Sequence, residues 1–427
     1  GSGTTVQLGT GASQTGFGRS GSVNWQTGSI KTTTFTAADG EGYFVDTSSG
    51  AVTVNLPAGS AGAIVAFSDY TRTFGTNALT ISPNGSNKIG GAAADTRLNV
   101  DGQAATFVFV DATEGWINVQ NAEDTEFGAT FISATGGSTA NDGDFKVHTF
   151  TGPGTFCVSS IANTAANNEV SYIVVAGGGG GGSNYAGGGG AGGFRESKSG
   201  VDTYTASPLE GATNITVTAT AFPIAVGAGG TGGTSNAGGP CGTASTFSTV
   251  TSAGGGGGGS VGNPSTLAGA NGGSGGGNAN DSQPLPAPSG NTPSVSPPQG
   301  NNGGQGRQGG CNGAGGGGGA GAVGGTGGSS GSGVVVGAGG AGVSSSITGA
   351  SVTRAGGGGG GGQNIAAGGA GGAGGGGAGS GCHSGAGGSA GTAGTANTGG
   401  GGGGATCGPN TGGAGGSGVV IIRYKFQ

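Results

Sequence analysis

Residues that could do chemistry are few and scattered in this chain of 427 residues. Between Ala212 and Ile422 there is one carboxylate, Asp281, and one histidine, His383. Glycoside hydrolysis needs a pair of carboxylates, and an acyl-transfer triad needs an acid, a histidine and a nucleophile together. The acids upstream fit solvated turns better than a lyase or depolymerase site. The sequence therefore predicts no catalytic residues and no enzyme.

Motifs for metals and cofactors are also missing. The segment 141–144, Asn-Asp-Gly-Asp, lacks the spacing and the final glutamate of an EF-hand loop, and an Asx turn explains it. Matches to the dinucleotide-binding glycine pattern follow from glycine content alone, because they lack the strand-to-helix context. We expect no metal and no cofactor.

The five cysteines offer a different chemistry. Cys157 lies in an expected strand and is predicted to be a buried thiol. The other four lie at inserts between glycine runs, where two of them could come within bridging distance: Cys241, Cys311, Cys382 and Cys407. None forms a C-x-x-C pair, so structural zinc is not expected, even though His383 follows Cys382. If a disulfide forms, Cys382 to Cys407 is the first choice.

Composition excludes several classes of partner. The chain has 119 glycines, only 7% charged residues and a net charge of −6, which is not the composition of an ordinary enzyme. A nucleic-acid surface needs clustered basic residues, yet Arg307 and Arg354 are the only ones between Gly200 and Ile422. No apolar run reaches the length of about 18 residues that a membrane span needs. We expect neither nucleic acid as a partner nor membrane insertion.

The stretch that must position any site runs from Gly177 to Gly418. Its glycine runs are separated by short polar inserts: 177–182, 187–190, 254–259, 315–319, 356–362 and 399–404. Glycine disfavours helix and ordinary strand because it loses the most backbone entropy on ordering. A flexible linker is one interpretation. The other is a bundle of polyglycine II helices, which have three residues per turn and must bond laterally to their neighbours.

Energetics and flanking strands favour the bundle. Ordering costs about 1 to 2 kcal/mol per residue, so a glycine bundle must be fully hydrogen-bonded or absent. Two apolar strands, 170–176 and 418–426, bracket the glycine stretch, and a linker this long between paired strands would be costly to close. Ala370 and Ala373, three residues apart, should then share one side that faces solvent or the flanking sheet.

The rest of the chain is predicted to form β-structure. Residues 1–20 predict a linker or the end of a shaft, 21–120 a small β-sandwich or barrel, and 121–144 an acidic connector. A glycine-rich domain follows over 145–427, with strands near 145–176, 213–226 and 419–426 and the polyglycine bundle over 177–418. The fold class is thus all-β plus a glycine bundle, with no α-helix. The thin core of the first domain suggests association of identical chains. A trimer is favoured only on the family resemblance described next.

Four segments carry a family resemblance when they are taken in order: 144–156, 172–182, 224–230 and 418–421. Together they resemble the glycine-rich domain of bacteriophage tail fibres and related structural proteins. The glycine core is similar to the tip adhesins of T-even-type phages, and residues 23–120 look more loosely like the small β-domains of phage fibre shafts. One departure is that those tip adhesins are separate chains, whereas here a β-domain precedes the glycine region.

The resemblance implies a structural protein of the virion, found on the particle or extracellularly, with receptor-binding loops at the distal end of the bundle. The implied partners are a host cell-surface glycan or outer-membrane protein, together with other virion proteins. The richest insert, 278–302, contains Leu285 and Pro286 among several prolines that keep a loop stiff. Further candidates are aromatic, basic or polar residues of other inserts: Asn184, Tyr185, Arg307, Gln363, Asn364, Ile365 and His383.

Two other functions stay open. The chain could be a self-assembling extracellular or virion filament or decoration subunit. It could also bind ice, because 391–396 repeats Gly-Thr-Ala and would present threonine and alanine at regular intervals. Collagen fits less well, since 14 prolines and no sustained Gly-x-y register cannot make a triple helix.

Overall fold

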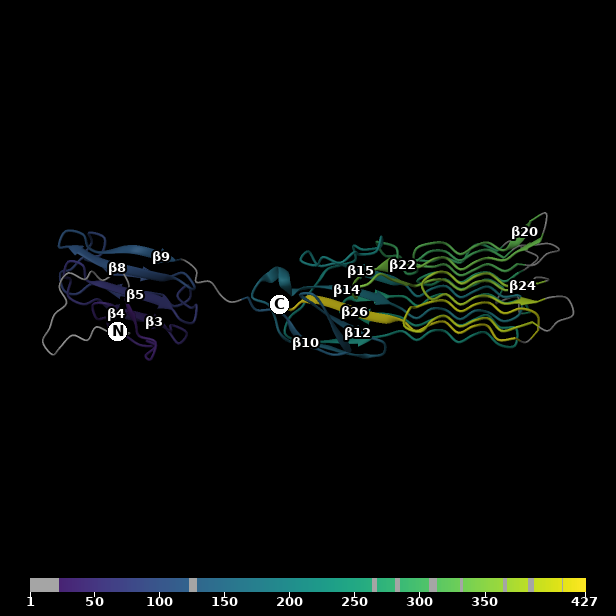
Figure 1. The fold of residues 1–427 in the computed structure, drawn as a ribbon, viewed down its shortest axis with the longest axis horizontal. Coiled ribbons are helices and arrows are strands. Elements are labelled where there is room, and N and C mark those ends of the chain that lie inside the picture. The colour runs from purple at the N-terminus through teal and green to yellow at the C-terminus, as the bar shows by residue number, and fades with distance from the viewer. Residues whose placement is uncertain are drawn as a thin grey trace, which may run out of the picture. The chain divides into compact units, whose positions relative to one another are not determined.

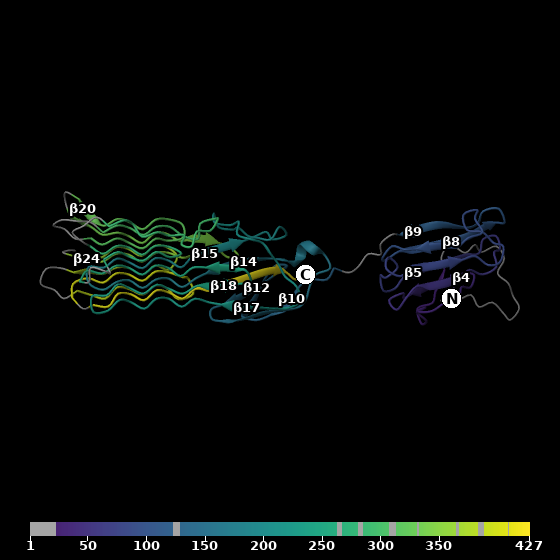
Figure 2. The same ribbon diagram turned by 180° about the vertical axis from the view of Figure 1, so that it is seen from behind.

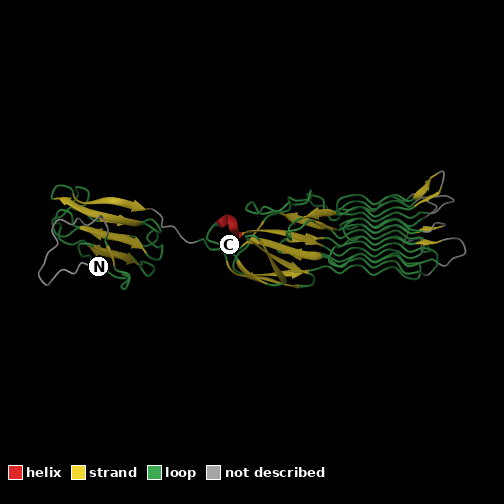
Figure 3. Ribbon diagram, in the orientation of Figure 1, coloured by secondary structure: helices red, strands yellow, loops and turns green. Residues whose placement is uncertain are grey.

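The computed structural model describes residues 23–122, 129–262, 267–280, 285–306, 313–330, 333–363, 367–382, 388–408 and 410–427. The chain divides into two compact units, residues 1–128 and 129–427, and each is described by itself. Among the described residues every regular element is a strand apart from one short 3-10 turn, Ala165–Asn168 (Figure 3). The prediction of an all-β protein is confirmed.

The first unit is a two-sheet sandwich (Figure 1). One sheet has the strand order β1-β3-β5-β8-β9 and the other β2-β4-β6-β7. The strands are β1 (Asn24–Trp25), β2 (Phe35–Thr36), β3 (Glu41–Val45), β4 (Val52–Asn55), β5 (Ile64–Asp69), β6 (Leu79–Ser82), β7 (Thr96–Leu98), β8 (Ala104–Asp111) and β9 (Gly115–Ala122). Alternating apolar residues such as Val52 and Val54 bury one face of their strand, and the core includes Phe67 and Trp116.

The second unit begins with two sheets, and in one of them the central strands come from both ends of the domain (Figure 2). One sheet has the order β11-β12-β26-β14-β15 with β16 beside β14, and the other β10-β13-β17-β18-β19. The strands are β10 (Ser133–Thr135), β11 (Ser138–Asp142), β12 (Phe145–Phe150), β13 (Gly154–Ser160), β14 (Glu169–Val175), β15 (Phe194–Ser197), β16 (Ile215–Thr216), β17 (Ala221–Ala225), β18 (Ser245–Phe247), β19 (Val250–Ser252) and β26 (Val419–Lys425). The last strand lies between β12 and β14, so Ile421 pairs with both Thr149 and Ile173.

The structure corrects two expectations for this region. The predicted acidic connector, 121–144, contains β10 and β11. In β11, Oδ2 of Asp142 forms an ion pair with Nη1 of Arg423 at 2.7 Å. Both β10 and β11 are exposed edge strands, so they lack the apolar alternation by which a strand is recognised. Cys157 is exposed rather than buried, because its neighbours Phe156 and Val158 occupy the inward face of β13.

The glycine region is ordered by lateral backbone hydrogen bonds, and it forms the set of long, nearly parallel traces in Figure 1. Partners repeat every third residue: Gly177, Gly180 and Ser183 donate to Thr243, Pro240 and Ala237, Gly178 and Gly181 to Gly416 and Gly413, and Gly179 and Gly182 to Gly190 and Gly187. One segment thus bonds to three different neighbours in rotation. Such a repeat is typical of helices with three residues per turn.

Glycine is required at interior positions where another backbone approaches closely. A Cβ atom added to Gly358 would lie 2.1 Å from the carbonyl oxygen of Gly402, and one added to Gly359 would lie 1.9 Å from that of Gly369. All residues of the run 356–362 are buried. At the periphery Ala370 and Ala373 are both exposed, as their spacing predicts.

We therefore expect a small substitution to destabilise the protein at an interior glycine but not at a peripheral alanine. Gly358→Ala should lower the free energy of unfolding by more than about 3 kcal/mol, because the clash is with backbone that cannot rotate away. Ala370→Ser should leave it unchanged. Thermal unfolding followed by circular dichroism measures both, and equal midpoints for the two variants would contradict the close-packed backbone.

Candidate functional site at the distal end of the glycine region

Turns between glycine segments gather at the end of the second unit that lies away from its two sheets (Figures 1 and 3). We call this the distal end and define it by residues 183–186, 234–237, 362–363, 380–382 and 405–408. The chain reaches this end repeatedly because its glycine segments are short, as in 177–182, and the chain then reverses direction. Side chains excluded from the bundle interior are therefore presented here.

The turn at 183–186 places Tyr185 at this end. Asn184 and Tyr185 have φ values of 62° and 50°, so both central residues are left-handed, as in a type I′ turn. Asparagine tolerates this conformation, but tyrosine adopts it at a cost. The turn at 234–237 has the same character, with φ of 50° at Ser235 and 63° at Asn236.

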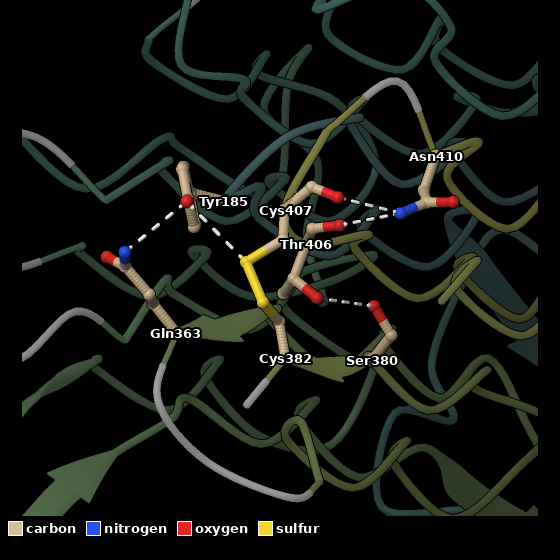
Figure 4. Close-up of a disulfide and its surroundings, with 7 residues drawn as sticks. All are labelled: Tyr185, Gln363, Ser380, Cys382, Thr406, Cys407 and Asn410. Carbon is tan, nitrogen blue, oxygen red and sulfur yellow. Dashed lines mark hydrogen bonds between the residues drawn. A yellow bond between two sulfur atoms is a disulfide. The ribbon is translucent and has the colours of Figure 1, made fainter. Parts of the chain in front are cut away.

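A disulfide joins two neighbouring turns. Cys382 and Cys407 are bridged with a Cα–Cα distance of 6.1 Å and a sequence separation of 25 residues (Figure 4). Cys382 closes β25 (Gly381–Cys382), which pairs in parallel with β24 (Gly362–Gln363). This is the pair favoured from the sequence, and it ties the turn at 380–382 to the turn at 405–408.

Tyr185 lies against this bridge (Figure 4). Its hydroxyl oxygen accepts a hydrogen bond from Nε2 of Gln363 at 3.3 Å and lies 3.5 Å from Sγ of Cys407. Because a bridged sulfur carries no hydrogen, the hydroxyl must be the donor in the second contact. Three candidates from separate inserts, Tyr185, Gln363 and Cys407, are thus brought together, while Asn184 turns aside and donates to the carbonyl of Val261 at 2.9 Å.

Further polar residues that sequence reasoning missed hold the same corner. Asn410 donates from Nδ2 to the carbonyl oxygens of Thr406 at 3.1 Å and Cys407 at 2.8 Å, and the Ser380 and Thr406 hydroxyls lie 3.2 Å apart (Figure 4). The only available signal was the position of Asn410 three residues after a cysteine, as expected of a side chain that closes a turn. These contacts fix the carbonyl groups around the bridge.

The proline-rich insert is not the free loop predicted from the sequence. Nδ2 of Asn278 donates to the carbonyl of Pro286 at 2.9 Å, and the amide of Gly303 donates to Pro288 at 2.9 Å. The segment therefore runs back along the side of the bundle, and the amide of Phe194 in β15 donates to the carbonyl of Gln299 at 2.8 Å. Proline suits this outer position because it has no N–H group that would need a lateral acceptor.

The other candidates divide into two groups. Leu285 and Pro286 stay near the distal end, next to Asn278, and Pro286 is exposed. The remaining candidates lie outside the described residues: Arg307, Asn364, Ile365 and His383. Cys241 is exposed on the side of the bundle between the packed residues Gly239 and Gly242, rather than in an end insert.

The described ranges offer no other type of site among those that fixed geometry would reveal, namely a metal centre or a membrane span. They contain no group of three or more His, Cys, Asp or Glu side chains placed to hold a metal ion. Nor do they contain a helix with the length and hydropathy required to cross a bilayer. The chemistry that the distal end offers is hydrogen bonding and packing by an aromatic ring, amides and hydroxyls.

The architecture, two sheets that frame a glycine bundle, defines the second unit as a β-framed glycine-rich domain. The family model of the glycine-rich domain matches residues 151–425, well over half of the chain, so the chain belongs to that family. A search of curated protein sequences gives no match.

The disulfide should stabilise the distal end measurably. Reduction should lower its free energy of unfolding by about 3 kcal/mol, the loop-closure value for a separation of 25 residues. Hydrogen exchange of the amides around Gln363 and Cys382, with and without reductant, measures this loss. Cys241→Ser is the matched control and should leave exchange unchanged. Equal protection in the oxidised and reduced chain would contradict a stabilising bridge.

Proposed function

We propose that the chain is a bacteriophage virion structural protein of the tail-fibre or adhesin type, whose glycine region is a polyglycine II scaffold presenting the distal end to a host-surface receptor. The observation that carries this proposal is the gathering of Tyr185, Gln363 and the Cys382–Cys407 bridge from separate inserts at one end. Loops on a rigid scaffold are a common arrangement for recognition. The proposed location is the virion surface or extracellular space.

The chemistry of the distal end supports a glycan or the loop of an outer-membrane protein as the receptor. An aromatic ring with a polar hydroxyl, beside amide groups, both packs and hydrogen-bonds at little entropic cost. Tyr185 is half-buried and held by its two contacts, so its ring is pre-organised. We further propose that identical chains associate, most economically as a trimer, and join other virion proteins.

The strained conformation of Tyr185 allows function to be tested apart from folding. Tyr185→Gly removes the ring while relieving a left-handed backbone, so the free energy of unfolding should stay within about 1 kcal/mol of wild type. Adsorption of the labelled chain to a bacterial strain that wild type labels should fall at least tenfold.

Ser235→Gly makes the same backbone change in the twin turn and is the matched control. It should adsorb like wild type. If Tyr185→Gly adsorbs normally, Tyr185 is not part of the receptor site, and if the wild-type chain labels no strain in a broad bacterial panel, the adhesin proposal fails.

The structure supplies an argument against the filament alternative. Outward positions of peripheral segments carry side chains, among them Ala228, Thr231, Ala338 and Ala341, all of them exposed. A further glycine segment approaching as closely as those inside the bundle would meet these Cβ atoms. Sideways addition of copies through this surface is therefore disfavoured, in the way that protected edges limit sheet growth.

Ice binding keeps one supporting observation. Thr392, Ala393, Thr395 and Ala396 are all exposed, and the adjoining segment adds exposed Thr411 and Ala414 in register, since Gly391 and Gly394 donate to their carbonyls. The regular patch is thus larger than the six residues seen in the sequence. Freezing hysteresis of the purified chain, lost in a Thr392→Lys, Thr395→Lys variant, is the expected result for this function. No hysteresis in the unaltered chain would remove it.

A further inference from the structure

The first unit contains a cleft that none of the preceding functions uses. It has a volume of about 500 Å³ and lies where the two sheets of the sandwich part, between the edge strands β7 and β9. Among the described strands, β7 pairs only with β6. Besides β8, strand β9 has one parallel bridge, between Trp116 and Ile89, so the sandwich is open along the rest of this edge. The volume is in the range of small-molecule binding sites.

The floor of the cleft is apolar and comes from the sandwich core. Leu98 and Phe107 are almost fully buried, and Trp116 is fully buried with its ring edge-on to Phe109 at 5.5 Å between centroids. Trp116 also brings an unmet donor, because its indole Nε1 has no acceptor in the described structure. A buried N–H without a partner is costly, so the Trp116 ring behind the wall of the cleft is sensitive to any shift of the side chains that cover it.

The rim, by contrast, is polar and partly pre-oriented. Oε1 of Gln103 accepts from the amides of Asn99 at 2.9 Å and Val100 at 3.2 Å, which fixes the direction of its Nε2. That Nε2 donates to Oδ1 of Asn121 at 3.0 Å, so Nδ2 of Asn121 remains as a donor. Oδ1 of Asn118 is likewise engaged, by the amide of Gln120 at 3.2 Å, which leaves the Asn118 Nδ2.

Two opposite charges complete the rim. Asp95 and Arg97 line the cleft, are exposed, and have no hydrogen-bond or ion-pair partner in the described chain. Asp95 can only accept and Arg97 can only donate, so together with the asparagine amides the rim offers both kinds of group. Because the two charges cancel, the cleft favours neither an anion nor a cation.

We propose that this cleft binds a neutral sugar, as one or two pyranose rings of a glycan. A sugar ring has C–H faces that pack on apolar side chains and hydroxyl groups that both donate and accept. This matches a wall with the half-buried Ile89 and Ile117 beside a rim of amides and opposite charges. A purely apolar ligand would leave the rim groups desolvated and unpaired. A phosphorylated ligand would meet one arginine beside a carboxylate. The site lies in a different unit from the distal end, so it stands or falls independently.

The chain supplies its own reporter for this site. It has two tryptophans, Trp25 and Trp116, and only Trp116 lines the cleft. In the full-length Trp25→Phe variant, which keeps an aromatic ring beside Phe44, all tryptophan fluorescence comes from the floor of the cleft. Titration with glucose, galactose and N-acetylglucosamine, and with disaccharides of each, should give a saturable change with at least one sugar, at a Kd between about 0.1 and 10 mM.

Rim variants in the same background decide the assignment. Arg97→Ala with Asn121→Ala should weaken binding of the sugar at least tenfold, while Asn55→Ala, an exposed asparagine on β4 outside the cleft, should leave it unchanged. Circular dichroism confirms that all variants are folded. The proposal is overturned if none of these sugars changes the fluorescence, or if the rim variant binds as well as the control. It is also overturned if the cleft instead closes on a second copy, seen as a doubled mass that the rim variant abolishes.

Discussion

The second unit depends on one constraint: backbones must approach closely enough for each segment to hydrogen-bond to three neighbours in turn. A Cβ atom added to an interior glycine would clash with a neighbouring carbonyl group. At Gly188, for example, it would lie 2.2 Å from the carbonyl oxygen of Gly358. Glycine brings no side-chain burial, so the order of the region rests on complete pairing of its peptide groups. The two sheets supply what the bundle lacks, namely apolar cores that anchor both ends of the glycine stretch through β14 and β26.

The same constraint sorts the few larger residues. In peripheral segments the exposed side chains lie in directions that have no neighbour. They recur every third residue at Ala228 and Thr231 and in pairs over 392–396. The bulkier groups lie outside the bundle interior, at its ends or, as with 285–299, along its side. At the sheet end, Arg423 pairs with buried Asp202 at 3.0 Å, whereas aromatic and amide groups collect around the disulfide at the opposite end. The two ends of the domain therefore differ in their side chains because the packed glycine segments between them leave no room for large groups.

The sequence predicted much of this architecture because two signals in it are unambiguous. Apolar alternation identified strands such as β6 and β12, and the uninterrupted glycine runs left few ordered alternatives. The short polar strands β1, β7, β10 and β11 were missed, since an edge strand needs no apolar face. The candidate site was predicted in part. That inserts must present the side chains follows from glycine chemistry, but which inserts meet depends on the order in which segments pack. A local reading therefore could not tell that 285–299 runs along the bundle or that Asn410 closes the corner of Cys407.

The three-residue repeat has a consequence for how such a chain can change during evolution. With a repeat of three residues, loss of one residue inside a run would rotate the rest of that segment by about 120° about its axis. An outward alanine such as Ala370 would then point toward a neighbouring carbonyl group. Loss of three residues would only shorten a segment by a turn. Insertions at the turn of Asn184 and Tyr185 have no such phase to preserve. The glycine segments can therefore change in length only by multiples of three residues. The turns at their ends can change freely in length and sequence.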